Sequence, residues 1–163
     1  MKALIIYESA FGNTELIAFA IRDVLSISGE TVAVHPDNVK PLDLKNYDLI
    51  IAGSPTQKFS PLPKIAAFLS SLPGGCLKGK NVAAFDTRID LMKQNNRFLS
   101  FMVWLFGYAA EPLAKKLKSK RGNLIVPAEG FFVDDTKGPI SEGELNRAKE
   151  WAENLIIRQT QIH

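Results

Sequence analysis

The fold of this chain is decided by the stretch Leu4-Ile5-Ile6-Tyr7-Glu8-Ser9-Ala10-Phe11-Gly12-Asn13-Thr14-Glu15-Leu16-Ile17. An apolar run stops abruptly there, small and polar residues follow, and an amphipathic pattern begins at once. This order predicts a buried strand, a tight loop and the N-terminus of a helix. Such a loop carries hydroxyls and backbone N–H groups, and the helix end adds about half a positive charge. The stretch therefore predicts a site for a phosphate group.

The alternation of strand and helix continues along the whole chain. Apolar runs predict strands at residues 2–7, 31–35, 47–53, 81–86 and 123–127. Helical patterns begin near residues 13, 60 and 141, and a further helical region falls within 97–120. Strands joined by helical crossovers run parallel and are covered on both faces. We therefore expect an α/β fold, a doubly wound five-stranded parallel sheet in a three-layer sandwich, with residues 1–163 forming one domain.

Two of the helix starts carry specific signals. Ser60 and Pro61 are typical of an N-cap and a first helical residue. Ser141 and Glu144 have the spacing of a capping box, and Leu145 begins the apolar stripe of the last helix.

Three predicted loops lie where open parallel sheets bind ligands, beyond the C-terminal ends of the strands. These loops cover residues 9–14, 54–60 and 86–90. The first lacks both the NTPase pattern Gly-x-x-x-x-Gly-Lys and the dinucleotide pattern Gly-x-Gly-x-x-Gly. It offers the hydroxyls of Ser9 and Thr14, the close backbone approach of Gly12, and no cationic side chain. These groups are adequate for a mononucleotide phosphate, and the alternative is an ordinary turn with Asn13 as the N-cap of the helix.

The loop also carries a family resemblance. The motif Ser9-x-x-Gly12-Asn13-Thr14-Glu15 after a buried strand resembles the phosphate loop of flavodoxins. The similarity extends over essentially the whole chain and implies the strand order 2-1-3-4-5. The chain also resembles a particular branch of short flavodoxin-like proteins in two later stretches, Phe85-Asp86-Thr87-Arg88 and Lys137-Gly138-Pro139-Ile140-Ser141-x-Gly143-Glu144-Leu145.

The resemblance implies a non-covalent FMN cofactor and an electron-transfer function with redox partner proteins. The implied phosphate contacts are Ser9, Ala10, Phe11, Gly12, Asn13 and Thr14. The implied contacts of the isoalloxazine ring are Ser54, Pro55, Thr56, Gln57 and Lys58 on one side and Asp86, Thr87 and Arg88 on the other. Alternatives are an FMN-dependent NAD(P)H or quinone-type reductase and a flavin-free interaction module of the same fold. A signalling receiver domain is disfavoured, because Gly53 and Ser54 stand where a receiver needs an aspartate.

The ring end departs from the pattern of electron-carrying flavodoxins. Those proteins typically stack the ring between a tryptophan and a tyrosine, and they are acidic, whereas this chain has a net charge of +3. A cation near the ring would stabilise the reduced, anionic flavin, and Arg88 and Lys58 are the candidates. The alternatives are that Arg88 pairs with Asp86 or Asp90 and that Lys58 is simply exposed.

The segment 98–108 is apolar around every side of a helix. Either it is a covered helix or lid near the flavin, or it is an exposed patch for a partner, a dimer or a membrane surface, assisted by nearby lysines.

The remaining residues predict no further chemistry. The basic run near residues 115–121 has no interleaved aromatic residues, so no nucleic-acid partner is expected. The single cysteine, Cys76, has no partner for a disulfide, and neither a catalytic acid–base set nor a metal site is expected. Glu8 is expected to be structural. With no signal peptide pattern and no apolar run long enough to span a bilayer, a cytoplasmic location is expected.

Overall fold

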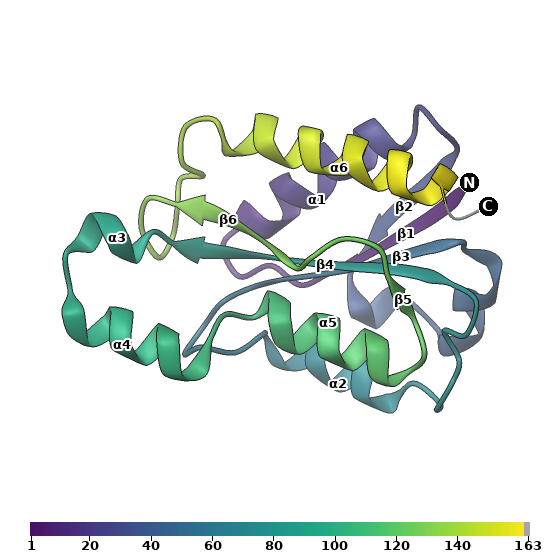
Figure 1. Cartoon of the computed structure of the whole chain (residues 1–163), viewed down its shortest axis with the longest axis horizontal. Helices are drawn as coiled ribbons and strands as arrows, with labels where there is room; N and C mark the ends of the chain where they lie inside the picture. The colour runs from purple at the N-terminus through teal and green to yellow at the C-terminus, as the bar shows by residue number, and fades with distance from the viewer. Residues whose placement is uncertain (162–163) are drawn as a thin grey trace.

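The apolar segments pair side by side in one parallel sheet in the computed structural model, which describes residues 1–161 apart from the side chains of residues 92, 94 and 106 (Figure 1). The strand order is β2-β1-β3-β4-β5, and a further strand, β6, also pairs with β4. This order confirms the predicted topology. The strands are β1 (Lys2–Tyr7), β2 (Glu30–Val34), β3 (Leu49–Pro55), β4 (Asn81–Ile89), β5 (Asn123–Leu124) and β6 (Glu129–Val133).

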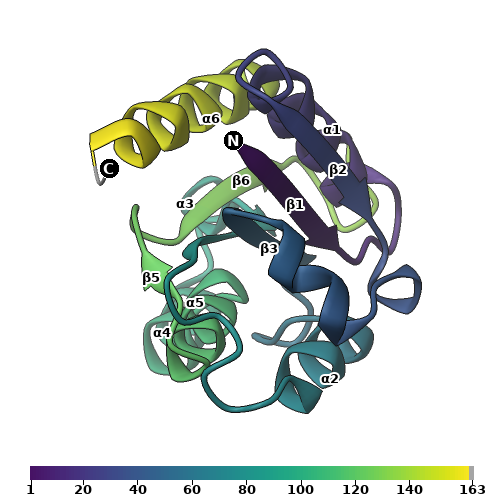
Figure 2. The ribbon, with the colours of Figure 1, turned by 90° about the vertical axis from the view of Figure 1, so that its right-hand side faces the viewer.

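Helices cover both faces of the sheet, as Figure 2 shows along the strand direction. One layer contains α1 (Asn13–Leu25) and α6 (Glu144–Gln161), and the other contains α2 (Pro63–Ser71) and α5 (Ala110–Ser119). Two short 3-10 helices, η1 (Pro36–Asn38) and η2 (Pro41–Asn46), connect β2 to β3. The helices α3 (Leu91–Gln94) and α4 (Arg97–Phe106) project beyond the C-terminal edge of the sheet (Figure 1).

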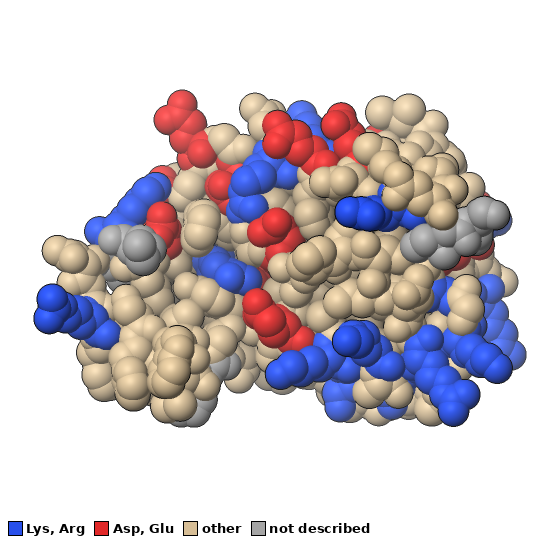
Figure 3. All heavy atoms as spheres, in the orientation of Figure 1, with Lys and Arg blue, Asp and Glu red and all other residues tan. Residues whose placement is uncertain are grey.

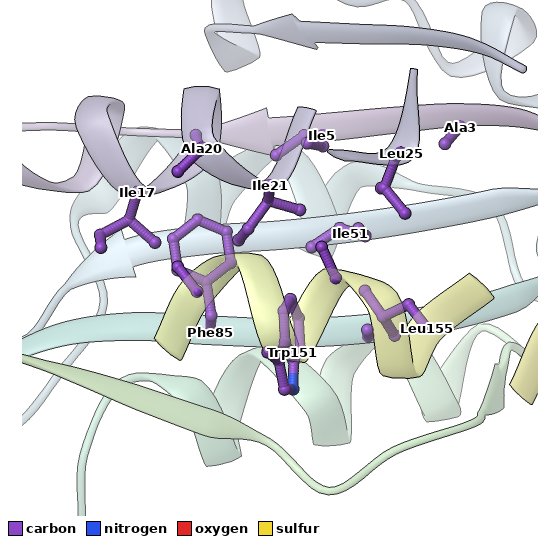
Figure 4. Packing of buried hydrophobic residues seen from close by; sticks show 14 of the residues in the cluster. Ala3, Ile5, Ile17, Ala20, Ile21, Leu25, Ile51, Phe85, Trp151 and Leu155 are labelled. Atoms are coloured by element: carbon purple, nitrogen blue, oxygen red, sulfur yellow. The ribbon is translucent and has the colours of Figure 1, made fainter. Parts of the chain in front are cut away.

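A hydrophobic core lies on each face of the sheet. On the α1 and α6 side, Ile21, Phe85 and Trp151 converge from three elements (Figure 4). The rings of Phe85 and Trp151 meet edge to face, with centroids 6.2 Å apart, a favoured aromatic geometry. On the other side Ile50 and Leu117 belong to a second cluster beneath α2 and α5. The two cores hold the C-terminal strand ends, and hence the predicted ligand loops, at one edge.

The last part of the sheet differs from the sequence prediction. We expect a fifth strand over residues 123–127, but β5 ends at Leu124 and the chain pairs again only from Glu129. Pro127 lies in this interruption and has no N–H to donate to a strand ladder. The resumed strand β6 runs parallel to the C-terminal half of β4, where Phe131 lies opposite Thr87. The fifth position of the sheet is thus built from two segments.

Two predicted helix starts are wrong. Helix α2 begins at Pro63, because Gln57 and Ser60 close a tight turn through reciprocal backbone bonds of 3.0 and 2.9 Å. At α6 the Ser141 hydroxyl donates to Asp134 instead of capping the helix.

The predicted capping box of α6 fails at its glutamate as well. The Glu144 carboxylate accepts the Phe132 backbone N–H at 2.7 Å and pairs with Arg147. Leu145 is exposed rather than inward-facing. Partners on β6 and directly after it bind the two polar side chains that the local pattern assigned to the helix end.

Glu8 has the structural role that its position suggests. It is buried at the end of β1, and its carboxylate accepts the Ile65 backbone N–H at 2.9 Å. This bond satisfies one of the free donors in the first turn of α2 and uses the positive end of that helix. Glu8 therefore fixes α2 against the C-terminal edge of β1.

Gly53 on β3 has no room for a side chain. A methyl group there would lie 2.2 Å from the ring of Phe85 in the core. We expect Gly53→Ala to lower the free energy of unfolding by about 1–3 kcal/mol, because overpacking shifts the surrounding core. Chemical denaturation measures this loss. Gly74→Ala is the matched control, since a methyl group at Gly74 would meet nothing within 4 Å, and an equal effect in both variants would contradict the prediction.

Candidate functional site

The loop before α1 leaves the first turn of that helix open. Gly12 is the N-cap residue, with a φ of 88° that favours glycine, and no side chain caps the helix. The Ser9 hydroxyl accepts the Gly12 N–H at 3.0 Å. Asn13 is the first helical residue, so the alternative of an ordinary turn capped by Asn13 is wrong. The backbone donors at this helix end are therefore available to an anion.

Two side chains tie this loop to distant parts of the fold. The hydroxyls of Thr14 and Thr87 are 2.8 Å apart and buried, which joins the start of α1 to the end of β4. Since each hydroxyl carries one hydrogen and only one lies between them, the pair retains one O–H donor. The Asn13 side chain packs against Gly138, where a methyl group would lie 2.6 Å from its oxygen. The loop is thus held rigidly beside β4.

A cleft opens beside this loop at the C-terminal edge of the sheet. The empty volume of the cleft, including the part that is open to solvent, is about 420 Å³. Its walls come from the phosphate loop, the ends of β3 and β4, and the end of β6. The lining residues are Ala10, Phe11, Asn13, Thr14, Pro55, Thr56, Gln57, Thr87, Arg88, Ile89, Val133 and Thr136.

The three predicted loops therefore meet at one cleft, although five predicted contacts do not line it. These are Ser9, Gly12, Ser54, Lys58 and Asp86. Three residues that line the cleft, Ile89, Val133 and Thr136, are not among the predicted contacts. Ile89 lies within the predicted third loop, whereas the other two belong to β6 and the turn after it, an element without a clear signal in the sequence.

The wall formed by the end of β3 is held by polar side chains. Ser54 is fully buried, and its hydroxyl accepts the Leu62 N–H at 2.8 Å and donates to the Pro55 carbonyl. Thr56 donates its N–H to the Thr87 carbonyl, and its hydroxyl accepts the Ala109 N–H, both at 2.9 Å. These bonds fix the wall to β4 and to the start of α5. Ser54 therefore fixes the β3 wall of the cleft, although it does not line the cleft itself.

Lys58 lies at the tip of the turn between Gln57 and Ser60. Lys58 and Phe59 both adopt positive φ, 48° and 64°, a conformation that non-glycine residues rarely adopt. The Lys58 side chain is exposed, as the alternative interpretation of this residue predicts.

Asp86 and Arg88 form a buried ion pair under the cleft. The Arg88 guanidinium donates to both carboxylate oxygens, at 2.6 and 2.8 Å, and the Ala110 N–H donates to the same carboxylate at 2.8 Å. The guanidinium also stacks on the Tyr108 ring at 3.6 Å. It fills the space left by Gly130, where a methyl group would lie 2.2 Å from it.

This geometry confirms the alternative interpretation of Arg88, in which it pairs with Asp86 and is not a lone cation near the ring. Burial raises the pKa of Asp86, while Arg88 and the Ala110 N–H act in the opposite direction. As an ionised pair the two side chains carry no net charge.

The aromatic residues of the cleft are few. Phe11 is the only aromatic side chain among the described residues that line it, and it is half exposed. The Lys137 ammonium lies 6.0 Å from its ring. Tyr108 contacts Arg88 and is absent from the lining. The structure thus agrees with the sequence in placing no tryptophan–tyrosine pair in the described walls.

The parallel sheet, its strand order and the open helix end define the class of flavodoxin-like α/β proteins. A family model described as a flavodoxin domain matches residues 4–128, so the chain belongs to the flavodoxin domain family. FMN is accordingly its cofactor. The uncapped start of α1 and the space beside Gly12, where a methyl group would meet nothing within 4 Å, fit a phosphate group.

Curated relatives with similar sequences are described as NAD(P)H dehydrogenase (quinone). The protein from Azorhizobium caulinodans is 33% identical over 111 residues, covering 53% of this chain and 56% of the relative. The protein from Cupriavidus metallidurans is 31% identical with the same coverage. The chain thus spans about half the length of the curated relatives that it matches.

Solved structures share the fold over almost the entire chain. Oxidised Flavodoxin 2 from Bacillus cereus has a TM-score of 0.72 and 23% identity, covering 97% of this chain and 99% of its own. A flavodoxin from the domain Archaea has a TM-score of 0.70 and 20% identity, with 98% and 99% covered. Rubredoxin oxygen:oxidoreductase from Desulfovibrio gigas has a TM-score of 0.73 and 16% identity, with 98% of this chain and 36% of that one covered.

We expect Arg88→Met to destabilise the protein by about 3–5 kcal/mol at neutral pH, because the buried Asp86 carboxylate loses its partner. The pKa of Asp86, already raised by burial, then rises further. The folded variant binds a proton more readily than its unfolded chain, so its stability increases as the pH falls toward the ordinary aspartate value.

Denaturation curves across a pH series measure this behaviour. The double variant Asp86→Asn, Arg88→Met is the control, and it should show a smaller loss without the pH dependence. A pH-independent loss in the single variant would contradict the buried-charge explanation.

Proposed function

We propose that residues 1–163 form a single cytoplasmic electron-transfer domain that binds FMN in the cleft and exchanges electrons with redox partner proteins. The observation that carries this proposal is the uncapped start of α1 beside Gly12, next to a cleft between the ends of β3 and β4. Support for a single domain comes from the two core clusters, which lie on opposite faces of one sheet.

The phosphate end of FMN would lie on the loop of residues 9–14. In this proposal its ligands are the first-turn N–H groups of α1 and the hydroxyl of Thr14. The open space beside Gly12 leaves room for the phosphate. Ser9 acts through its bond to the Gly12 N–H, which holds the loop in shape. The helix end supplies about half a positive charge, so no cationic side chain is needed.

The ring would lie between the wall of residues 55–57 and the wall of residues 87–89. When bound, FMN supplies the redox chemistry, taking up or releasing electrons with an accompanying proton. Ile89 and Val133 provide apolar surface that shields a bound ring from water. Ser54 and Asp86 contribute by fixing the two walls, through Leu62 and Ala110 respectively.

The paired state of Arg88 changes the expected tuning of the flavin. A lone charge about 6 Å away, at an effective dielectric near 20, is worth about 3 kcal/mol. In the ion pair the Asp86 carboxylate opposes most of that effect. We infer that Arg88 shifts the flavin potential less than an isolated cation in the same place would.

A quinone-type reductase is the second candidate function. The observation in its favour is the 33% identity over 111 residues with the NAD(P)H dehydrogenase (quinone) of Azorhizobium caulinodans. That activity requires a hydride donor to reach the flavin, whereas an electron carrier receives electrons from a separate protein.

We expect the freshly purified protein to be yellow and, once stripped of flavin, to bind FMN at least about 100-fold more tightly than riboflavin. Two charge-assisted hydrogen bonds to the phosphate account for a factor of this size. Ser9→Ala should weaken FMN binding about tenfold and leave riboflavin binding unchanged, because it loosens only the phosphate loop.

Flavin fluorescence titration measures both constants. Ser70→Ala, which removes a hydroxyl from the exposed side of α2, is the matched control. A colourless protein that binds neither flavin would refute the proposal, and equal affinities for FMN and riboflavin would refute the phosphate assignment.

We expect the purified FMN-loaded protein to show no steady-state oxidation of NADH or NADPH with a soluble quinone. Adding a separate flavodoxin reductase should restore electron flow, because a carrier needs another protein as its electron donor. The absorbance of the nicotinamide measures the rate. Rapid turnover without the added reductase would favour the reductase function instead.

A further inference from the structure

Helix α4 exposes four large apolar side chains. The exposed fractions are 69% for Phe98, 53% for Phe101, 78% for Trp104 and 54% for Leu105. These four residues, here called the α4 patch, fall on one side of the helix by their three- and four-residue spacing. The rings of Phe101 and Trp104 stack with centroids 5.9 Å apart. The interpretation of 98–108 as a covered lid is therefore wrong: these four side chains are exposed, while contact with a partner, a dimer or a membrane stays a prediction.

The α4 patch stands apart from the main body of the protein. Figure 1 shows α3 and α4 projecting past the end of the sheet, and Figure 2 shows α4 in line with α5 on the same face. Helix α4 packs mainly against the short helix α3. A contiguous exposed apolar surface of this kind marks an interaction site.

The charges closest to the patch in sequence are basic. Residues 91–110 include Lys93 and Arg97 and no aspartate or glutamate, and the acidic residues Asp90 and Glu111 lie just outside this segment. Next along the same face, α5 exposes Lys115, Lys116 and Lys118. In the lower part of Figure 3 a largely uncharged region lies at the α4 end and a dense group of basic side chains lies toward the α5 end, with an acidic side chain between them. The surface is therefore apolar at its tip and basic beside it.

We propose that α4 docks the protein on the surface of an anionic lipid bilayer. The aromatic side chains of the α4 patch enter the interface, where tryptophan and phenylalanine are favoured, and the basic residues of α3, α4 and α5 face the headgroups. A second copy of the chain fits less well, because it would bring the same basic residues into one interface.

The contact lies in the plane of the membrane. Over residues 1–161 no helix is both long and apolar enough to cross a membrane. Helix α4 has ten residues and is about 15 Å long, half the thickness of a bilayer core. The Ala109 N–H, just after α4, is bound by the Thr56 hydroxyl in the cleft wall. Docking through α4 therefore holds the cleft close to the lipid surface.

Co-sedimentation of the full-length FMN-loaded protein with vesicles tests the proposal. We expect binding to vesicles of phosphatidylcholine that contain about one third phosphatidylglycerol, and weak binding to vesicles of phosphatidylcholine alone. Phe101→Ser, Trp104→Ser should reduce partitioning into the anionic vesicles about tenfold or more. Lys93→Gln, Arg97→Gln should reduce it about fivefold for each charge removed.

Matched controls separate the patch from general surface effects. Ile27→Ser, Leu42→Ser removes two apolar side chains that are 85% and 71% exposed elsewhere on the protein, and Lys149→Gln removes an exposed charge on α6. Neither should change vesicle binding. Circular dichroism and bound flavin verify that every variant is folded.

Tryptophan fluorescence gives an independent measurement. Trp104 is exposed and Trp151 is buried, so insertion of α4 should shift the emission of Trp104 to shorter wavelength on adding anionic vesicles. Trp104→Phe should abolish the shift.

Absence of binding, equal binding to both vesicle compositions, or wild-type binding by the Phe101→Ser, Trp104→Ser variant would overturn the proposal. So would a lipid-independent dimer, seen by sedimentation velocity, that this variant abolishes.

Discussion

The site depends on the backbone N–H groups at the start of α1, which the helix cannot satisfy itself. Burial of β1 between two helical layers brings this helix end to the edge of the sheet, and Gly12 allows the sharp change of direction before it. No side chain of the loop caps the helix. The arrangement is open to an anion, and the buried Thr14–Thr87 contact fixes it relative to β4. The proposed phosphate-binding end of the cleft is thus part of the packed fold.

The ring end is held by a different kind of interaction. Asp86 and Arg88 are close in sequence, but both also contact more distant parts of the chain. The Asp86 carboxylate accepts the first N–H of α5, and the Arg88 guanidinium packs on the Tyr108 ring. Removing two charges from water is costly, and the three donated hydrogen bonds to the carboxylate offset that cost. A basic side chain that could tune a flavin is therefore also a link between β4 and α5.

The protein joins a conventional flavodoxin sheet to an unusual exposed helix. The chain just after α4 is attached to the cleft wall by the bond from the Ala109 N–H to the Thr56 hydroxyl. The proposed docking surface and the proposed flavin cleft are therefore neighbours at the same edge of the sheet. The basic residues beside α4 also distinguish its surface from that of an acidic electron carrier.

The sequence by itself determined the alternation of strands and helices and the loop at residues 9–14. These follow from local patterns: the apolar run before Glu8, the glycine at position 12 and the periodicity of the helices. The strand order was implied by the resemblance to flavodoxins, and the structure confirms it. Only the tertiary structure decided the partners of the polar side chains. Ser141 and Glu144 match a local capping pattern, yet Asp134 and the backbone of Phe132 bind them. Arg88 could be assigned to flavin or to Asp86 until its distance to the carboxylate was known. Likewise the apolar composition of α4 did not reveal whether it was covered, because burial depends on elements distant in the sequence. Local backbone preferences can be read along the chain, whereas competition among distant hydrogen-bond and packing partners is resolved only in the folded protein.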